Sequence, residues 1–106
     1  MVDEITPAAL QARMAGEHTP QVLDVREDWE RDIARLPFTI DIPMAEVPDR
    51  LGELSRERDV VVMCRSGGRS LKVAQFLAAQ GFRRVSNLTG GILGWAQQVD
   101  PSMRMY

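Results

Sequence analysis

Short runs of β-branched and other apolar residues alternate with stretches of helical periodicity, and this alternation constrains the fold more than any other feature. The expected strands are QVLDV, FTIDI, DVVVMC and RRVSNL, at residues 21–25, 38–42, 59–64 and 83–88. The expected helices are residues 6–16, 27–36, 45–57, 69–81 and 91–100. The unbroken VVVM run indicates a strand that is buried on both faces. We therefore predict an α/β fold with a central, mainly parallel sheet flanked by helices on both faces.

The length of 106 residues suits one domain spanning residues 1–106. Hydrophobic residues make up 44% and charged residues 26% of the chain, as in ordinary soluble proteins. A net charge of -2 gives no reason to expect nucleic acid or a membrane surface as partner. No apolar run reaches the roughly 18 residues of a membrane span, and the N-terminus lacks the pattern of a signal peptide. The sequence therefore favours a cytoplasmic location.

The chain has one cysteine, Cys64, and one histidine, His18. A single cysteine can form no internal disulfide and no Cys-x-x-Cys redox pair, and a structural zinc site would lack most of its usual ligands. We therefore expect no metal and no cofactor. We assign no role to His18, which falls in an expected loop.

Cys64 ends an apolar strand, and the polar residues that follow it lead directly into a helix. They are Arg65, Ser66, Gly67, Gly68, Arg69 and Ser70. In parallel α/β sheets, ligands bind at the carboxyl ends of the strands, and the first turn of a helix offers unpaired N–H groups. The two glycines let the loop curl so that its N–H groups point into one concavity, while the arginine and serine side chains add donors.

Such a loop can stabilise a thiolate. A free cysteine with a pKa near 8.5 is only about 3% ionised at pH 7, and a drop of two units corresponds to about 2.7 kcal/mol. The simpler interpretation is that Cys64 is a small hydrophobic residue that closes a core strand. Its position before two glycines, two arginines and a helix start favours the interpretation as an anion-binding nucleophile.

Several segments carry a resemblance to a known family. They are LDVRE (23–27), IDIPM (40–44), VVVMCRSGGRS (60–70) and GFRRVSNLTGGILGW (81–95), in the family's order. The chain resembles the rhodanese-like sulfurtransferase domain, in particular the single-domain rhodanese family. The closing VDPSMRMY resembles the tail of rhodanese domains that can be fused to sulfur-carrier adenylyltransferases.

The resemblance implies a reaction in two displacements. The Cys64 thiolate would attack the outer sulfur of a small anionic donor such as thiosulfate, release sulfite and hold the sulfur as a persulfide. A thiol, a sulfur-carrier protein or, in an assay, cyanide would then accept it. The physiological donor and acceptor, the pathway and the oligomeric state are not specified by the sequence.

Two alternative functions are weighed against sulfur transfer. Related cysteine-dependent phosphatases and arsenate reductases place five residues between the cysteine and the arginine, whereas four separate Cys64 from Arg69 here. The shorter loop makes a smaller cradle, which suits one sulfur atom better than a tetrahedral phosphate. A binding module that has lost the activity is the other alternative, and the intact cysteine argues against it.

The charged residues near the expected site have more than one interpretation. Asp24 and Arg26 match the family's Asp-x-Arg pattern, which implies a position near the cysteine and an ion pair that joins two loops. Arg69 either points into the anion site or pairs beneath the loop with an acid such as Asp24. Arg65 either attracts the anionic donor at the pocket mouth or is a solvated charge.

Two serines, a glycine-containing turn and two tryptophans are expected to support the site. Ser66 and Ser70 could donate hydrogen bonds to the persulfide, although Ser70 could instead cap the helix. Residues 89–91 should form a turn on the catalytic side with Trp95 packed behind it, and Trp29 should be a core or cleft-wall aromatic residue.

One segment departs from the family's pattern. Many family members carry Gly-His-Ile-x-Gly-Ala between positions 31 and 42, where this chain reads RDIARLPFTIDI. The departure bears mainly on substrate preference.

Overall fold

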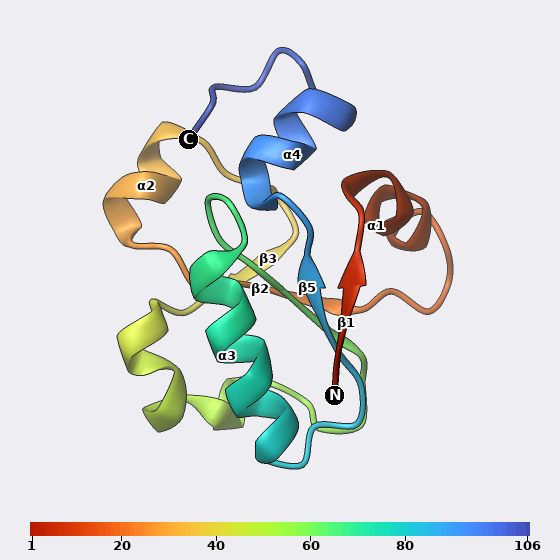
Figure 1. Cartoon of the computed structure of the whole chain (residues 1–106), viewed down its shortest axis with the longest axis vertical. Coiled ribbons are helices and arrows are strands. Elements are labelled where there is room, and N and C mark those ends of the chain that lie inside the picture. Colours follow the sequence, from red (N-terminus) through yellow and green to blue (C-terminus); the bar gives the residue numbers. More distant parts are fainter.

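The computed structural model describes residues 1–106, and five strands form its single sheet (Figure 1). The strands are β1 (Val2–Ile5), β2 (Gln21–Asp24), β3 (Thr39–Asp41), β4 (Val60–Met63) and β5 (Val85–Leu88). Their order across the sheet is β1-β5-β4-β2-β3, and every neighbouring pair is parallel. The predicted parallel sheet is therefore confirmed, and all four expected strands are present.

Four α-helices and two short 3₁₀ helices surround the sheet. The α-helices are α1 (Pro7–Met14), α2 (Asp28–Ile33), α3 (Gly68–Ala79) and α4 (Gly91–Gln98). The 3₁₀ helices are Met44–Asp49 and Leu51–Glu53, in the stretch expected to be one helix over 45–57. That expectation is wrong for an α-helix. Pro48 is the fifth of the six residues of the first 3₁₀ helix, and it has no N–H to donate to an α-helical hydrogen bond.

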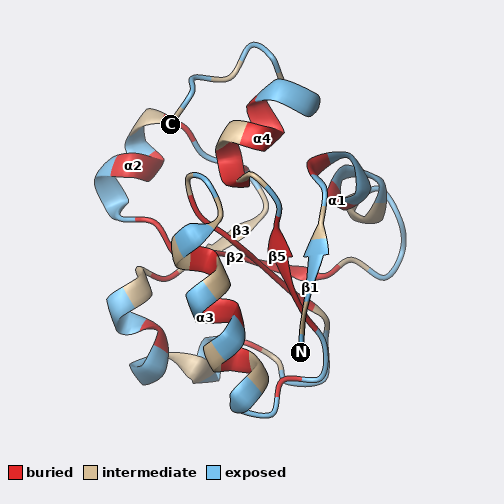
Figure 2. Cartoon of the chain, viewed as in Figure 1, coloured by how far each residue is buried: buried red, intermediate tan, exposed pale blue.

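The side chains of β4 divide the core into two layers. Val60, Val62 and Cys64 face the cluster that includes α3 and the first 3₁₀ helix. Val61 and Met63 face the opposite cluster, which includes residues of α1 and α4. All four residues of β4 are buried, as are those of its neighbour β5, which is red in Figure 2. Helices therefore cover both faces of the sheet, as expected, and Cys64 belongs to the α3 side.

Strand β1 was not expected from the sequence. It pairs along β5, with Val2 opposite Val85 and Ile5 opposite Leu88, while Asp3 and Glu4 between them are exposed. A four-residue edge strand with two acidic residues has no clear strand pattern in its own sequence. It is recognised as a strand only by its pairing with β5. None of the helices has the length and apolar character that crossing a bilayer requires.

Candidate active site

Cys64 directly follows β4 at the carboxyl edge of the sheet, where a short loop turns into α3 (Figure 1). We call residues 64–70 the cysteine loop. Cys64 is only 1% exposed, and it is a free thiol. The strand–loop–helix arrangement expected from the sequence is confirmed, and α3 begins one residue earlier than expected, at Gly68.

Hydrogen-bond donors surround the Cys64 sulfur. The Gly67 N–H donates to Sγ at 3.0 Å, and the Ser70 hydroxyl lies 3.3 Å from Sγ. Burial alone would raise the pKa of Cys64, but donation from the Ser70 hydroxyl and from the N–H groups of Ser70, Gly67 and Ser66 outweighs it. The net effect is a pKa below the ordinary value, so the site favours the thiolate.

The backbone of the cysteine loop is fixed from behind by the N-terminus of α4. The N–H of Ile92 donates to the Cys64 carbonyl at 2.9 Å, and the N–H of Leu93 donates to the Arg65 carbonyl at 3.2 Å. The loop carbonyls are thereby directed toward α4, while the Gly67 N–H donates to the sulfur on the other side. The expected turn at residues 89–91 therefore lies beside the site and holds it.

Glycine is required at two positions of this arrangement. Gly67 has φ of 114°, a left-handed conformation that other residues rarely adopt. Gly91 has φ of 59°, and a Cβ placed there would lie 2.5 Å from the carbonyl oxygens of both Cys64 and Arg65. Gly68 has no positive φ, and the space where a Cβ would stand is open. Glycine is therefore not required at Gly68, contrary to expectation.

The two serines of the loop have different surroundings. Ser70 is fully buried, and its hydroxyl faces the sulfur rather than capping α3, whose first turn has no side-chain cap. Ser66 is exposed, and its backbone N–H, not its hydroxyl, is the group that helps to lower the pKa of Cys64.

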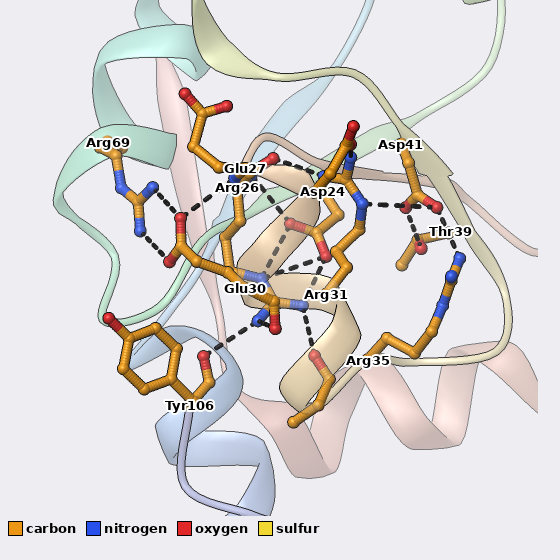
Figure 3. Close-up of polar contacts among 12 residues, drawn as sticks. Asp24, Arg26, Glu27, Glu30, Arg31, Arg35, Thr39, Asp41, Arg69 and Tyr106 are labelled. Atoms are coloured by element: carbon orange, nitrogen blue, oxygen red, sulfur yellow. Dashed lines mark hydrogen bonds and ion pairs between the residues drawn. The ribbon is translucent and has the colours of Figure 1, made fainter.

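Arg69 pairs with a carboxylate that the sequence did not reveal. Its two Nη atoms each donate to one oxygen of Glu30, both at 2.7 Å (Figure 3). Glu30 comes from α2 and is 3% exposed. The hydrogen bonds from Arg69 lower the pKa of Glu30 and in turn raise the pKa of Arg69. Of the two arrangements expected for Arg69, pairing with an acid is the one that forms, but the acid is Glu30 and not the suggested Asp24. No local pattern in α2 links Glu30 to Arg69, which is 39 positions away.

Asp24 and Arg26 form a fully buried ion pair at the end of β2, with Nη2 and Oδ2 separated by 2.8 Å. The Arg26 side chain also donates to the Ala34 carbonyl at 2.8 Å and the Tyr106 carbonyl at 2.9 Å. The expected ion pair is present, but its two residues are only two positions apart, so the pair itself does not join two loops. The joining of separate segments comes from Arg26 alone, which connects β2 to the end of α2 and to the terminal segment (Figure 3).

Arg65 has no carboxylate partner. Its guanidinium lies over the Tyr106 ring, 4.7 Å from the ring centroid, and its buried Nε has no hydrogen-bond partner. The Tyr106 ring packs in turn against Trp29, with the centroids 5.2 Å apart. Trp29 is 55% exposed, so it is not a core residue, whereas Trp95 is buried as expected.

Asn87, on β5, also belongs to this site. It is 4% exposed, and its side-chain oxygen lies 2.5 Å from the Ser70 hydroxyl. Asn87 falls within the strand predicted at residues 83–88, but the sequence alone assigns it no role. A polar amide near the carboxyl end of a buried strand is the signal that points to it.

Comparison with known proteins agrees with this geometry. A family model described as a rhodanese-like domain matches residues 6–98. The chain belongs to the rhodanese-like domain family. This rhodanese-like chain is 39% identical over 97 residues to a protein named "Sulfurtransferase" from Allochromatium vinosum, covering 92% of this chain and 91% of the relative.

Two further comparisons define the relationship. The rhodanese-like chain is 32% identical over 101 residues to "Adenylyltransferase and sulfurtransferase MOCS3" from Arabidopsis thaliana, covering 80% of this chain but 22% of that longer protein. It superimposes on the crystal structure of a rhodanese-like domain protein from Staphylococcus aureus with a TM-score of 0.85. The sequence identity to that structure is 28%, and 99% of each chain is covered. The predicted family and fold are therefore confirmed.

Proposed function

We propose that the protein is a sulfurtransferase in which Cys64 is the nucleophile and carries the transferred sulfur as a persulfide. The observation that supports this most directly is the buried Cys64 sulfur with the Gly67 N–H 3.0 Å away and the Ser70 hydroxyl 3.3 Å away. Donors at these distances stabilise negative charge on the Cys64 sulfur and so favour the nucleophilic thiolate.

The first displacement begins with the Cys64 thiolate attacking the outer sulfur of the donor. For thiosulfate, a new S–S bond forms to Cys64 while the bond between the two donor sulfurs breaks, and sulfite leaves with the electron pair. The negative charge of the thiolate passes to the terminal sulfur of the persulfide, which remains beside the loop donors.

The second displacement returns the enzyme to its starting state. A nucleophilic acceptor, a thiolate or cyanide, attacks the terminal sulfur, and the Cys64 thiolate leaves with the electrons of the broken S–S bond. We propose a low-molecular-weight thiol or a sulfur-carrier protein as acceptor. The printed name of the Arabidopsis relative, which joins an adenylyltransferase to a sulfurtransferase, supports considering a carrier protein. Because a reducing compartment keeps a lone thiolate from oxidation, the proposal includes a cytoplasmic location.

Arg65 is proposed to bind the anionic end of the donor. It adjoins Cys64 in sequence, and neither its Nε nor its charge is engaged by a carboxylate. A guanidinium without a carboxylate partner can donate paired hydrogen bonds to the oxygens of a sulfonate group.

The alternative of a phosphatase or arsenate reductase is disfavoured by Arg69. A loop that binds a tetrahedral oxyanion needs the arginine's forked donors free to face the anion. Here both Nη atoms of Arg69 donate to Glu30 at 2.7 Å. A sulfur atom on Cys64 needs no such clamp.

The test is to incubate the reduced protein with thiosulfate and measure its intact mass, then add cyanide and measure thiocyanate. We expect a persulfide adduct of about 32 Da on Cys64 and thiocyanate in successive, ping-pong steps. Cys64→Ser is the matched control and should give neither. If thiosulfate and low-molecular-weight persulfides all leave the wild-type mass unchanged, the sulfurtransferase proposal is wrong. Full cellular function of the Cys64→Ser variant would instead favour a binding module.

A second test concerns Arg65. Losing one charge-assisted contact of about 1.5–3 kcal/mol should lower kcat/KM for thiosulfate by roughly 10- to 100-fold in Arg65→Gln. A low-molecular-weight persulfide, which donates sulfur without a sulfonate group, should be much less affected. Equal losses for both donors would contradict the anion-binding role.

A further inference from the structure

The orientation of the Asn87 side chain is determined by its neighbours. Its Nδ2 lies 3.1 Å from a Glu4 carboxylate oxygen and 3.2 Å from the Gly67 carbonyl oxygen. Both of these groups only accept hydrogen bonds, so the amide nitrogen must face them. The Asn87 Oδ1 is therefore left facing Ser70, with its oxygen 2.5 Å from the Ser70 Oγ.

This orientation fixes where the Ser70 proton goes. Oδ1 has no proton, so Ser70 must be the donor in this short hydrogen bond. A hydroxyl has one proton, and the same Oγ lies 3.3 Å from the Cys64 sulfur. While Ser70 donates to Asn87, it presents a lone pair to Cys64, an arrangement that suits an S–H thiol donating to Oγ.

Ionisation of Cys64 reverses this preference. Once the thiol proton has left to solvent, the thiolate needs the Ser70 proton, and Ser70 can provide it only by rotating away from Asn87. Asn87 Oδ1 then loses the only donor it has, at a site that is 4% exposed, and a buried acceptor without a partner is costly. The hydroxyl of Ser70 is thus shared between two competing acceptors.

We propose that Asn87 is a positioning residue that competes with the Cys64 sulfur for the Ser70 proton and so restrains ionisation of the nucleophile, while Glu4 holds the Asn87 amide in the competing orientation. Cys64 as nucleophile rests on the proposed function, but the competition itself concerns only the thiol. Glu4 is suited to this role because it also accepts from the Thr89 hydroxyl at 2.8 Å.

Charged residues also stand on the elements around the cysteine loop: Glu4 of β1, Asp24 of β2, Glu30 of α2, Arg65 of the loop itself and Arg69 of α3, whose charge interacts with the Cys64 thiolate. Helix α4, which also borders the loop, contains no charged residue. A substitution of the neutral Asn87 leaves all of these charges in place. Its effect on ionisation therefore reports the hydrogen-bond competition.

The experiment measures ionisation of Cys64 as the pH dependence of its alkylation by iodoacetamide in four proteins. These are the wild type, Asn87→Leu, Ser70→Ala and the double variant. In Asn87→Leu, Ser70 can donate to the sulfur without leaving an orphaned acceptor, so we expect the alkylation pKa to fall by about one unit. In Ser70→Ala the sulfur loses a donor, and we expect a rise of similar size.

The double variant separates positioning from a general structural effect. Without the Ser70 hydroxyl there is no proton to redirect, so adding Asn87→Leu to Ser70→Ala should change the alkylation pKa by less than about 0.3 units. The leucine leaves no buried acceptor without a partner. The Gly67 carbonyl still accepts from the Leu71 N–H, and the exposed Glu4 carboxylate can bind water. If Asn87→Leu does not fold, Asn87→Val, which suits a strand, takes its place.

Two results would overturn the proposal. One is an unchanged or raised alkylation pKa in Asn87→Leu. The other is a decrease that persists at full size in the Ser70→Ala background. Alkylation does not depend on sulfur transfer, so a protein that forms no persulfide would refute the proposed function and still give an answer on Asn87.

Discussion

Replacing Arg26 with methionine removes the cation that holds the end of β2, the end of α2 and the terminal segment together. Its side chain is fully buried and donates to Asp24 through Nε and Nη2, the latter at 2.8 Å. Without it, the buried Asp24 carboxylate keeps only the backbone N–H of residue 26, at 3.0 Å. The Ala34 and Tyr106 carbonyls also lose a donor.

The magnitude follows from leaving a buried charge unpaired. Breaking such a pair costs about 3–5 kcal/mol, a large part of the roughly 5–15 kcal/mol by which small domains are stable. With an m-value of about 1.5–2 kcal/mol/M for a small domain, the urea midpoint at pH 7 should fall by about 2 M. Circular dichroism at increasing urea concentrations measures this shift directly.

Two further variants make the test specific. Arg35→Met removes an exposed cation that pairs with Asp41 at the surface, and it should cost less than about 1 kcal/mol. The double variant Asp24→Asn/Arg26→Met leaves no unpaired buried charge at the end of β2 and should be at least about 1 kcal/mol more stable than Arg26→Met. The reasoning fails if Arg26→Met loses less than about 1 kcal/mol or if the double variant is no more stable than the single one.

Three other substitutions test separate parts of the site. Gly91→Ala forces a Cβ to within 2.5 Å of two carbonyl oxygens at a positive φ, so the melting temperature should fall by more than about 8 °C; an unchanged value would contradict the close approach. Glu30→Gln should lower the free energy of unfolding at pH 7 by about 1–2 kcal/mol. The loss is modest because the Arg69 side chain is 37% exposed and solvent screens the pair. The pKa of Glu30 is lowered in the folded protein, so the stability from its pair with Arg69 is present above the unfolded pKa near 4.3 and is lost as the pH falls through the folded pKa. The urea midpoints of the wild type and Glu30→Gln should therefore converge toward pH 3, and midpoints that diverge would contradict this role of the pair. Tyr106→Ala should raise the thiosulfate KM about 2- to 5-fold by releasing Arg65, whereas Tyr106→Phe should not; equal effects would rule out the ring contact.

Several elements could be predicted because their causes are local. The apolar runs at 21–25 and 59–64 form buried parallel strands, and the glycines after Cys64 precede a helix start, as the sequence indicated. The expected helix over 45–57 is instead two 3₁₀ helices, because Pro48 cannot donate the backbone hydrogen bond that an α-helix needs at this position. Strand β1 was missed because its residues become a strand only by pairing with β5, more than 80 positions away.

For this protein, the sequence by itself determined four of the five strands, the family and the place of Cys64 on a strand-to-helix turn. These features depend on periodicity, on glycine and on the order of neighbouring residues, all of which can be read along the chain. Tertiary structure alone decided which charges are free: Arg69 pairs with Glu30, Arg65 lies against Tyr106, and Asn87 faces Ser70. Those partners lie far apart in sequence, and only the packing of α2, β5 and the terminal segment around the cysteine loop brings them within contact distance.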